Sequence, residues 1–426
     1  MQNIALEQLG AGISEETLRQ VLTQSLAGQA IPAHALIVAP DISRLHSRGG
    51  RITAIYYELL TQAGCQVDVI PALGSHLAMQ PEEIRQMFGP DIPLERFIVH
   101  DYRNDVVTLG QVPADFVREV SEGLLEEAID VQVNRRLVDP KYGLILSVGQ
   151  VVPHEVVGMA NHAKNIFVGV GGNSMINGTH FLGAVYGMER IMGRRDTPVR
   201  AVLDYALEHF MADAPLVFAL TVIGKHQGNN ALNGLFISPG RACYEQAAAL
   251  SQRLNLDILD RPLKKVVVYL EPGEFRSTWI GNKAIYRTRM AIADGGELIV
   301  LAPGVRQCGE DPALDPLLRK YGYAGRDAIL KAAAENDDLK ANLSAAAHLI
   351  HGSSDGRFAI TYCPGHMTRQ QVEAIHFGYM PYDQAAARYN PNALADGFNT
   401  LPDGEEIFYI SNPALGLWAL RERMDG

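Results

Sequence analysis

Residues 34–64 read HALIVAPDISRLHSRGGRITAIYYELLTQAG, and this stretch decides the fold. Its opening, residues 34–40, is a short, continuously apolar run, which is typical of a buried parallel strand. A polar loop and the pair Gly49-Gly50 follow, and residues 52–64 then carry apolar side chains at helical spacing. Because strand, loop and helix in this order form the repeating unit of a parallel sheet, the stretch predicts an α/β fold.

The same alternation continues along the chain, with one helix that begins after Ser14 and another after Pro81. Connections between such parallel strands are right-handed crossovers, which produce a mostly parallel sheet covered by helices. The further predicted elements are strands at 65–73, 96–101, 142–149, 216–224 and 233–240, and helices at 182–212 and 241–254.

The alternation of strands and helices restarts after Asp260-Arg261-Pro262, where a proline and charged residues interrupt it. We therefore predict two α/β domains, residues 1–262 and residues 263–426, with mostly parallel sheets. Ligands of open α/β sheets bind beyond the carboxyl ends of the strands, so we expect the active site in a cleft between the two domains. The second series comprises predicted strands at 264–273, 297–304, 357–365 and 405–412, and a helix at 283–296.

The composition is that of an ordinary soluble globular protein, with 47% hydrophobic and 20% charged residues. The formal net charge of -11 argues against nonspecific binding of nucleic acid, which requires a basic face. No apolar run approaches the roughly 20 residues that span a bilayer, and no signal peptide is evident. The cysteines stand apart, without a CxxC pair for structural zinc, and isolated thiols suit a reducing cytoplasm. They are Cys65, Cys243, Cys308 and Cys363.

Residues 153–180, PHEVVGMANHAKNIFVGVGGNSMINGTH, gather three histidines and a lysine in an apolar, glycine-rich region. His154, His162, Lys164 and His180 could supply acid/base groups, a metal ligand and a covalent anchor. The alternative is that they are unrelated surface and core residues. The apolar neighbours of Lys164 favour a lowered pKa, and the predicted loop around His180 leaves its ring open to a metal. No second ligand stands at conventional spacing, so zinc is not expected.

Two shorter motifs follow predicted strands. Residues 41–44, DISR, have the composition of an anion-binding loop, in which Arg44 binds a carboxylate or phosphate and Asp41 orients it. An ordinary surface salt bridge is the alternative. His76 comes directly after Gly74-Ser75, where an imidazole is placed for proton transfer. The glycines of residues 169–172 do not form a dinucleotide fingerprint, because Ser174 stands where the third glycine is required.

Taken in order, these motifs resemble the lactate racemase family of nickel-pincer 2-hydroxyacid racemases and epimerases. The resemblance runs from about residue 36 to residue 304 and rests on the spacing of the set rather than on any single motif. It is carried by DISR at 41–44, GSH at 74–76, PHEVVGMANHAK at 153–164, His180 and WIGNK at 279–283.

The resemblance implies a nickel-pincer nucleotide, a nicotinic-acid-derived mononucleotide that holds nickel through a ring carbon and two sulfurs. It implies that Lys164 tethers this cofactor through a thioamide and that His180 is the fourth nickel ligand. Asp41 and Ser43 are expected beside the cofactor or the Arg44 side chain. Separate maturation enzymes, which make the cofactor, are the expected partners.

The resemblance also implies the catalytic groups. His76 and His154 are expected to be paired acid/base residues, one on each face of the substrate. Arg44 and Lys283 are expected to hold the substrate carboxylate. The resemblance implies no role for His162. The implied reaction inverts C2 of a 2-hydroxy acid by hydride transfer through a 2-keto acid.

The sequence departs from the lactate-acting pattern near Lys283. Ile280 stands where that pattern has a glutamine, and its active-site tryptophan has no identified counterpart. The polar neighbours of Lys283, among them Arg276, Tyr286 and Arg287, favour a longer, polyhydroxylated acid of the aldonate type. Two other classes remain open: a metal-dependent hydrolase with His154 and His180 as ligands, and a cofactor-free binding protein that retains the fold.

Overall fold

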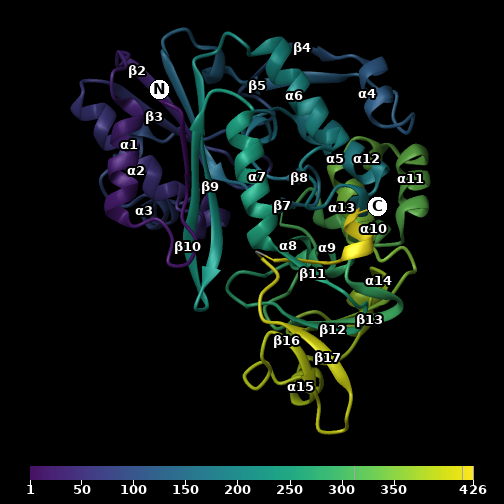
Figure 1. Ribbon diagram of the computed structural model, residues 1–426. Coiled ribbons are helices and arrows are strands. Elements are labelled where there is room, and N and C mark those ends of the chain that lie inside the picture. Colours follow the sequence, from purple (N-terminus) through teal and green to yellow (C-terminus); the bar gives the residue numbers. More distant parts are fainter. Residues whose placement is uncertain (311, 415, 426) are drawn as a thin grey trace. The chain divides into compact units, whose positions relative to one another are not determined.

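The computed structural model describes residues 1–310, 312–414 and 416–425 (Figure 1). The chain divides into two compact units: residues 1–182 with 192–255, and residues 183–191 with 256–426. The predicted division into folding domains at residue 262, with a cleft between the domains, stays a prediction. Within the described residues, no helix has both the length and the apolar character needed to cross a bilayer.

The first unit is built on a six-stranded sheet in the order β1-β10-β9-β6-β2-β3. The strands β3, β2, β6 and β9 are parallel, and the hairpin β9–β10 and the edge strand β1 are antiparallel. The mostly parallel α/β sheet predicted from the sequence is therefore confirmed. The strands are β1 Ile4–Glu7, β2 His34–Ala39, β3 Gln66–Pro71, β6 Leu144–Gln150, β9 Leu216–His226 and β10 Asn229–Ser238.

Three helices pack on one face of this sheet: α1 (Glu15–Leu26), α2 (Gly49–Gln62) and α3 (Pro81–Phe88). Ser14 caps α1 by accepting a hydrogen bond from the Thr17 amide at 3.1 Å. Leu22 and Ile55 are fully buried against the strands, and each such side chain stabilises the unit by about 1.5–3 kcal/mol. Helix α7 (Ala242–Asn255) packs against β9 and β10.

The remaining elements of the first unit surround the stretch that bears the predicted site. They are the antiparallel pair β4 Val106–Val112 and β5 Ile129–Asn134, the short pair β7 Pro153–His154 and β8 Gly158–Met159, the helices α4 Ala114–Val120 and α6 Pro198–Phe210, the 3-10 helices η1 Ile42–Ser47, η2 Leu94–Arg96 and η3 Arg135–Val138, the π-helix η4 Asn165–Gly169, and α5 Asn173–Tyr186, which continues into the second unit.

The second unit has its own six-stranded sheet in the order β15-β14-β13-β12-β17-β16, parallel except for β16. The strands β11 and β18 form a separate parallel pair. The strands are β11 Leu256–Leu259, β12 Leu263–Tyr269, β13 Ile292–Ala302, β14 Ala359–Pro364, β15 Gly378–Tyr379, β16 Gly397–Thr400, β17 Glu406–Ile410 and β18 Leu417–Leu420. The helices are η5 Met188–Arg190, α8 Thr278–Gly281, α9 Lys283–Thr288, α10 Asp315–Tyr321, α11 Arg326–Glu335, α12 Asp337–Lys340, α13 Leu343–His351, α14 Arg369–Ala374, α15 Tyr382–Arg388 and α16 Arg421–Asp425.

Three predicted elements differ in the structure. Residues 96–101 form only an isolated bridge, between Phe97 and Val69, and Val99 is 60% exposed. The predicted helix at 182–212 is two helices, because α5 ends at Tyr186 and Pro198 starts α6 under a cap from Thr197. The predicted helix at 283–296 stops at Thr288, and its last residues belong to β13.

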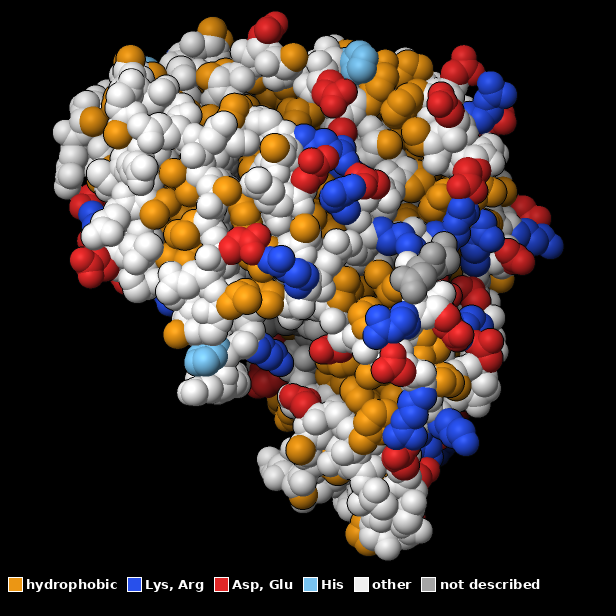
Figure 2. All heavy atoms as spheres, in the orientation of Figure 1, with side chains coloured by type: hydrophobic (Ala, Val, Ile, Leu, Met, Phe, Trp, Pro, Cys, Tyr) orange, Lys and Arg blue, Asp and Glu red, His pale blue; other side chains and the backbone are white. Residues whose placement is uncertain are grey.

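Charged side chains of both signs are intermixed on the face drawn in Figure 2. No single-sign basic area covers that face, and the formal net charge of the whole sequence is -11. An intermixed surface of this kind does not attract a phosphate backbone.

Candidate active site

His76 and Asp41 meet because their strands are neighbours. Strands β2 and β3 pair in parallel with Ala39 opposite Pro71, so the loops after them leave the same edge of the sheet. His76 Nδ1 lies 2.6 Å from Asp41 Oδ2, and Ser43 Oγ donates a hydrogen bond to Asp41 Oδ1 at 2.5 Å. The Asp41 side chain is 7% exposed and the His76 side chain 55% exposed. A buried carboxylate therefore holds an imidazole whose other edge is open.

The electrostatics of this pair fix its protonation. Burial by itself raises the pKa of Asp41, but the charge of His76 and the hydrogen bonds from His76 and Ser43 outweigh it and lower the pKa to about 2. The ionised carboxylate accepts the Nδ1–H of His76, and in the neutral form of the ring this leaves the lone pair on Nε2. His76 is thereby arranged as a proton acceptor.

His154 has the opposite arrangement. It ends β7, and its Nδ1 accepts a hydrogen bond from the Val156 amide at 3.1 Å. Burial lowers its pKa well below the usual value, against the opposing charge of Glu155, whose Oε2 lies 3.8 Å from Nδ1. The ring is therefore neutral with its proton on Nε2, and it is arranged as a hydrogen-bond donor.

Lys164 directly precedes the π-helix η4. Burial lowers its pKa from 10.5 to about 8, and the charge of Arg44 contributes in the same direction. Glu155 and Asp41 oppose this shift. A lysine with this pKa is about one-tenth neutral at pH 7, far more than an ordinary lysine, and an amine is nucleophilic in its neutral form.

His180 lies inside α5, and the prediction that it occupies an open loop is wrong. Its Nδ1 donates a hydrogen bond to the Ile176 carbonyl at 2.6 Å. Burial lowers its pKa to about 4, and the charge of Lys164 adds to this effect. The Nε2 lone pair therefore stays available, and a histidine fixed through its other nitrogen is the usual form of a metal ligand.

A tight glycine turn connects Lys164 to His180. A Cβ on Gly171 would lie 1.8 Å from the Phe167 carbonyl oxygen, so only glycine fits this turn. The turn is also anchored from outside, because His100 Nε2 donates to the Gly171 carbonyl at 2.9 Å while His100 Nδ1 accepts from Asn134 at 3.0 Å. This structural role of His100 was not predicted from the sequence.

The residues fit the implied cofactor. The described part of the chain contains no group of three His, Cys, Asp or Glu side chains that could hold a metal. A metal at His180 therefore needs its other ligands from a bound group, which a pincer nucleotide provides. Lys164 offers the amine for its tether, and the charge of Lys164 acts on the His180 pKa.

Several predicted residues lie near one another in the first unit. The charge of Arg44 acts on the pKa values of Asp41, His154 and Lys164, and η1 holds Arg44 partly buried. Lys283 is the first residue of α9 in the second unit, where its Nζ lies 5.8 Å from the centre of the Phe275 ring. Its contribution to the site stays a prediction.

His162 is separate from this group. It is 1% exposed, and its ring packs against Phe218 and Tyr244 at centroid distances of 4.0 and 5.4 Å. Burial lowers its pKa well below the usual value. Its position in an aromatic layer agrees with the prediction that it has no acid/base role.

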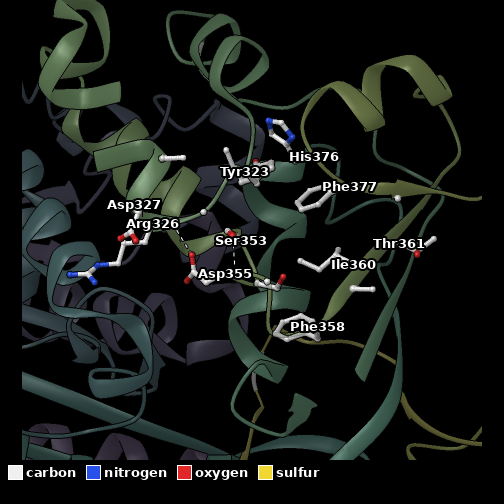
Figure 3. Close-up of a pocket in the computed structure, with 17 residues that line it drawn as sticks. Tyr323, Arg326, Asp327, Ser353, Asp355, Phe358, Ile360, Thr361, His376 and Phe377 are labelled. Atoms are coloured by element: carbon white, nitrogen blue, oxygen red, sulfur yellow. Dashed lines mark hydrogen bonds between the residues drawn. The ribbon is translucent and has the colours of Figure 1, made fainter. Parts of the chain in front are cut away.

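A cavity of about 980 Å³ lies in the second unit and contains none of the predicted residues (Figure 3). Its central polar groups already bind one another: Asp355 Oδ1 accepts the Arg326 amide at 2.7 Å, and the Asp355 amide donates to Ser353 Oγ at 2.9 Å. The Asp355 carboxylate thus occupies the N-terminus of α11, where an anion would otherwise bind.

Comparisons with known proteins concern the family and the fold of this chain. Residues 12–191 match the family model described as the lactate racemase N-terminal domain. No curated protein sequence matches the chain. A crystal structure of a Thermotoga maritima protein superposes with a TM-score of 0.82 at 23% identity, covering 98% of this chain and 100% of that chain. The lactate racemase apoprotein from Thermoanaerobacterium thermosaccharolyticum superposes with a TM-score of 0.70 at 15% identity and the same coverage of 98% and 100%. The two structures share the fold of this chain, and the similarity to the lactate racemase N-terminal domain covers residues 12–191.

Proposed function

We propose that the protein is a nickel-pincer-dependent racemase or epimerase that inverts C2 of a 2-hydroxy acid. The observation that carries the proposal is the pair of histidines in opposite tautomers, His76 held by Asp41 and His154 held by the Val156 amide. One ring is arranged to accept a proton and the other to donate a hydrogen bond. Loss of the hydride from C2 requires a base for the hydroxyl proton, and the second ring stabilises the same oxygen from the other face.

The cofactor proposal rests on Lys164 and His180. Lys164 carries the nucleotide through a thioamide, and His180 Nε2 is the metal ligand from the protein. When bound, the pincer nucleotide supplies the acceptor for the C2 hydride. Separate maturation enzymes deliver it. The four cysteines are all free, which favours a reducing cytoplasm as the place of both processes.

The side chains of this protein then perform the acid/base chemistry. His76 takes the hydroxyl proton on Nε2, and Asp41 stabilises the imidazolium that forms. His154 donates a hydrogen bond from Nε2–H to the substrate oxygen from the other face, and the proton held by His76 returns to that oxygen when the product forms. Arg44 binds the substrate carboxylate. The 2-keto acid then turns so that its opposite face is exposed to the reacting groups. Return of hydride and proton on that face would give the opposite configuration.

The substrate is proposed to be longer than lactate. Ile280 lies in α8 beside Trp279, whose indole stacks on the His348 ring at a centroid distance of 3.9 Å. His348 Nδ1 is in turn hydrogen-bonded to the Tyr286 hydroxyl at 2.8 Å. The proposal of a polyhydroxylated acid of the aldonate type rests on the polar residues that surround Lys283 in the sequence, Arg276 and Arg287 among them.

The proposal is tested with protein co-produced with the maturation enzymes. Intact mass is expected to show a nickel-containing, mononucleotide-sized adduct that Lys164→Ala abolishes. Single enantiomers of lactate, longer 2-hydroxy acids and aldonates are then incubated with the loaded protein, and configuration at C2 is followed. Stoichiometric zinc without nickel, or retention of configuration in every acid although the adduct is present, contradicts the proposed reaction.

A further inference from the structure

Arg200 is a buried cation that lies next to the chain segment leading to Lys164. It belongs to α6 and is 1% exposed. Its Nη2 donates to two backbone carbonyls, that of Met159 at 2.8 Å and that of Asn161 at 3.1 Å. A guanidinium this deeply buried requires partners for its charge and its donors, and here both carbonyls lie just before the proposed anchor.

The segment that Arg200 contacts has an unusual backbone. Asn161 and His162 have φ values of 70° and 57°, in the left-handed region that residues other than glycine rarely adopt. Consecutive residues in this region persist only where their surroundings enforce it. The Asn161 side chain helps locally, since its Oδ1 accepts the His162 amide at 2.8 Å. The two carbonyl contacts of Arg200 hold the same turn from outside.

Arg200 is itself fixed from two sides. Its guanidinium lies 4.1 Å from the centre of the Tyr244 ring, and its Nη1 lies 3.9 Å from Asp204 Oδ1. Asp204 Oδ2 forms an ion pair with Arg241. The turn, Arg200, Tyr244 and Asp204 thus form one connected buried network.

The turn determines the path of the chain to the anchor. The His162 carbonyl accepts the Asn165 amide at 2.9 Å, which starts the helical segment, and the Asn165 side chain donates to Ser147 Oγ at 3.0 Å. Lys164 lies between these two fixed points, so a change in the turn redirects its side chain.

We propose that Arg200 is a positioning residue for the anchor, one that holds the left-handed Asn161-His162 turn so that Lys164 presents its amine for attachment of the cofactor. This inference rests on the proposed function, because it takes Lys164 as the anchor. Arg200 contacts no reacting atom. Its positive charge also contributes to the lowered pKa of Lys164.

The test compares three variants: Arg200→Met, the conservative Arg200→Lys, and the control Arg241→Met. Arg241 shares the Asp204 partner but makes no contact with the carbonyls of the turn. The rate of amide hydrogen exchange in the peptide spanning residues 159–166 of the apoprotein measures how rigidly the turn is held. Intact mass after co-production with the maturation enzymes reports adduct formation. Thermal unfolding confirms that each variant is folded.

Arg200→Met is expected to speed exchange in this peptide and to lower adduct yield by roughly tenfold or more, because two charge-assisted hydrogen bonds are lost. Arg200→Lys restores one donor and is expected to fall between. Arg241→Met is expected to lower the melting temperature. The exchange rate of the peptide and the adduct yield are expected to stay at their wild-type values. If Arg200→Met does not fold, the same comparison is made between Arg200→Lys and Arg241→Met.

Two results overturn the inference. The first is wild-type exchange of residues 159–166 in a folded Arg200 variant. The second is a wild-type adduct yield in that variant. Absence of any adduct on the wild-type chain contradicts the proposed function instead, so the two failures are distinguishable.

Discussion

His76 Nδ1 lies 2.6 Å from Asp41 Oδ2, which joins an exposed imidazole to a buried carboxylate. From the sequence, Asp41 was expected beside either the cofactor or the Arg44 side chain. The contact shows instead that it is a hydrogen-bond partner of His76. Asp41 sets the tautomer of His76, and under the proposed function its ionised carboxylate would stabilise the imidazolium that forms when His76 takes a proton.

Asp41→Asn is therefore expected to lower kcat of the loaded enzyme by about a hundredfold or more, since it removes the charge and can reverse the tautomer. Ser43→Ala is the matched control, because it removes only the 2.5 Å hydrogen bond to the other oxygen of the same carboxylate. That variant is expected to lose a few-fold at most. Initial rates at saturating substrate measure both. A rate for Asp41→Asn within a factor of about three of wild type contradicts this role.

Stability is expected to fall as the solution becomes acidic, because the first unit buries several neutral histidines. Burial lowers the pKa of His180 to about 4 and the pKa values of His100, His154 and His162 below their usual value. The unfolded chain binds these protons below about pH 6.5 while the folded chain does not. Stability is therefore fully present above about pH 6.5 and declines as the pH falls below it.

Between pH 6.5 and pH 5, His180 alone, with its pKa of about 4, is expected to contribute up to about 2 kcal/mol of lost unfolding free energy, and the other three histidines act in the same direction. Urea unfolding of the apoprotein at a series of pH values measures the decline. His180→Gln is expected to flatten the curve, since the variant removes one titrating group. A free energy of unfolding that stays constant from pH 7 to pH 5 contradicts the prediction.

Lys164 is expected to destabilise the apoprotein at neutral pH. Its pKa is lowered from 10.5 to about 8, so the folded state holds the ammonium less favourably than the unfolded chain does. The penalty is full below about pH 8 and disappears above about pH 10.5. Lys164→Met is expected to raise the unfolding free energy by up to about 3 kcal/mol at pH 7, and thermal unfolding measures this. A lower melting temperature for Lys164→Met at pH 7 contradicts the buried-amine interpretation.

The sheet could be predicted from the sequence because local rules decide it, whereas the contact between His76 and Asp41 was not predicted. Apolar runs such as residues 34–40 mark parallel strands, and loops after adjacent parallel strands leave the same edge. The prediction failed for the helix that carries His180, since residues 173–179, NSMINGT, are poor helix formers. Tertiary packing decides there: a Cβ on Gly178 would lie 3.0 Å from the Ile129 side chain, so α5 fits closely against β5. The contacts of Arg200 have no sequence signal either, because they join α6 to carbonyls about 40 residues earlier.

Substitution of Gly171 tests whether the turn between Lys164 and His180 sets the position of His180. Gly171→Ala places a Cβ 1.8 Å from the Phe167 carbonyl oxygen, and backbone cannot yield as a flexible side chain can. The turn must shift, and with it the hydrogen bond from His100 and the start of α5. We expect a loss of stability of roughly 1–3 kcal/mol and, in the folded fraction, retention of the Lys164 adduct with weakened nickel binding.

Gly240→Ala is the control, because no atom lies within 4 Å of its Cβ position and its φ is not in the left-handed region. Nickel-to-protein ratios after dialysis against a chelator, together with intact mass, separate the metal from the tether. Because the turn lies between Lys164 and His180, the variant is expected to lose metal before it loses the covalent adduct. Equal nickel retention in Gly171→Ala and Gly240→Ala would show that the turn does not set the position of His180.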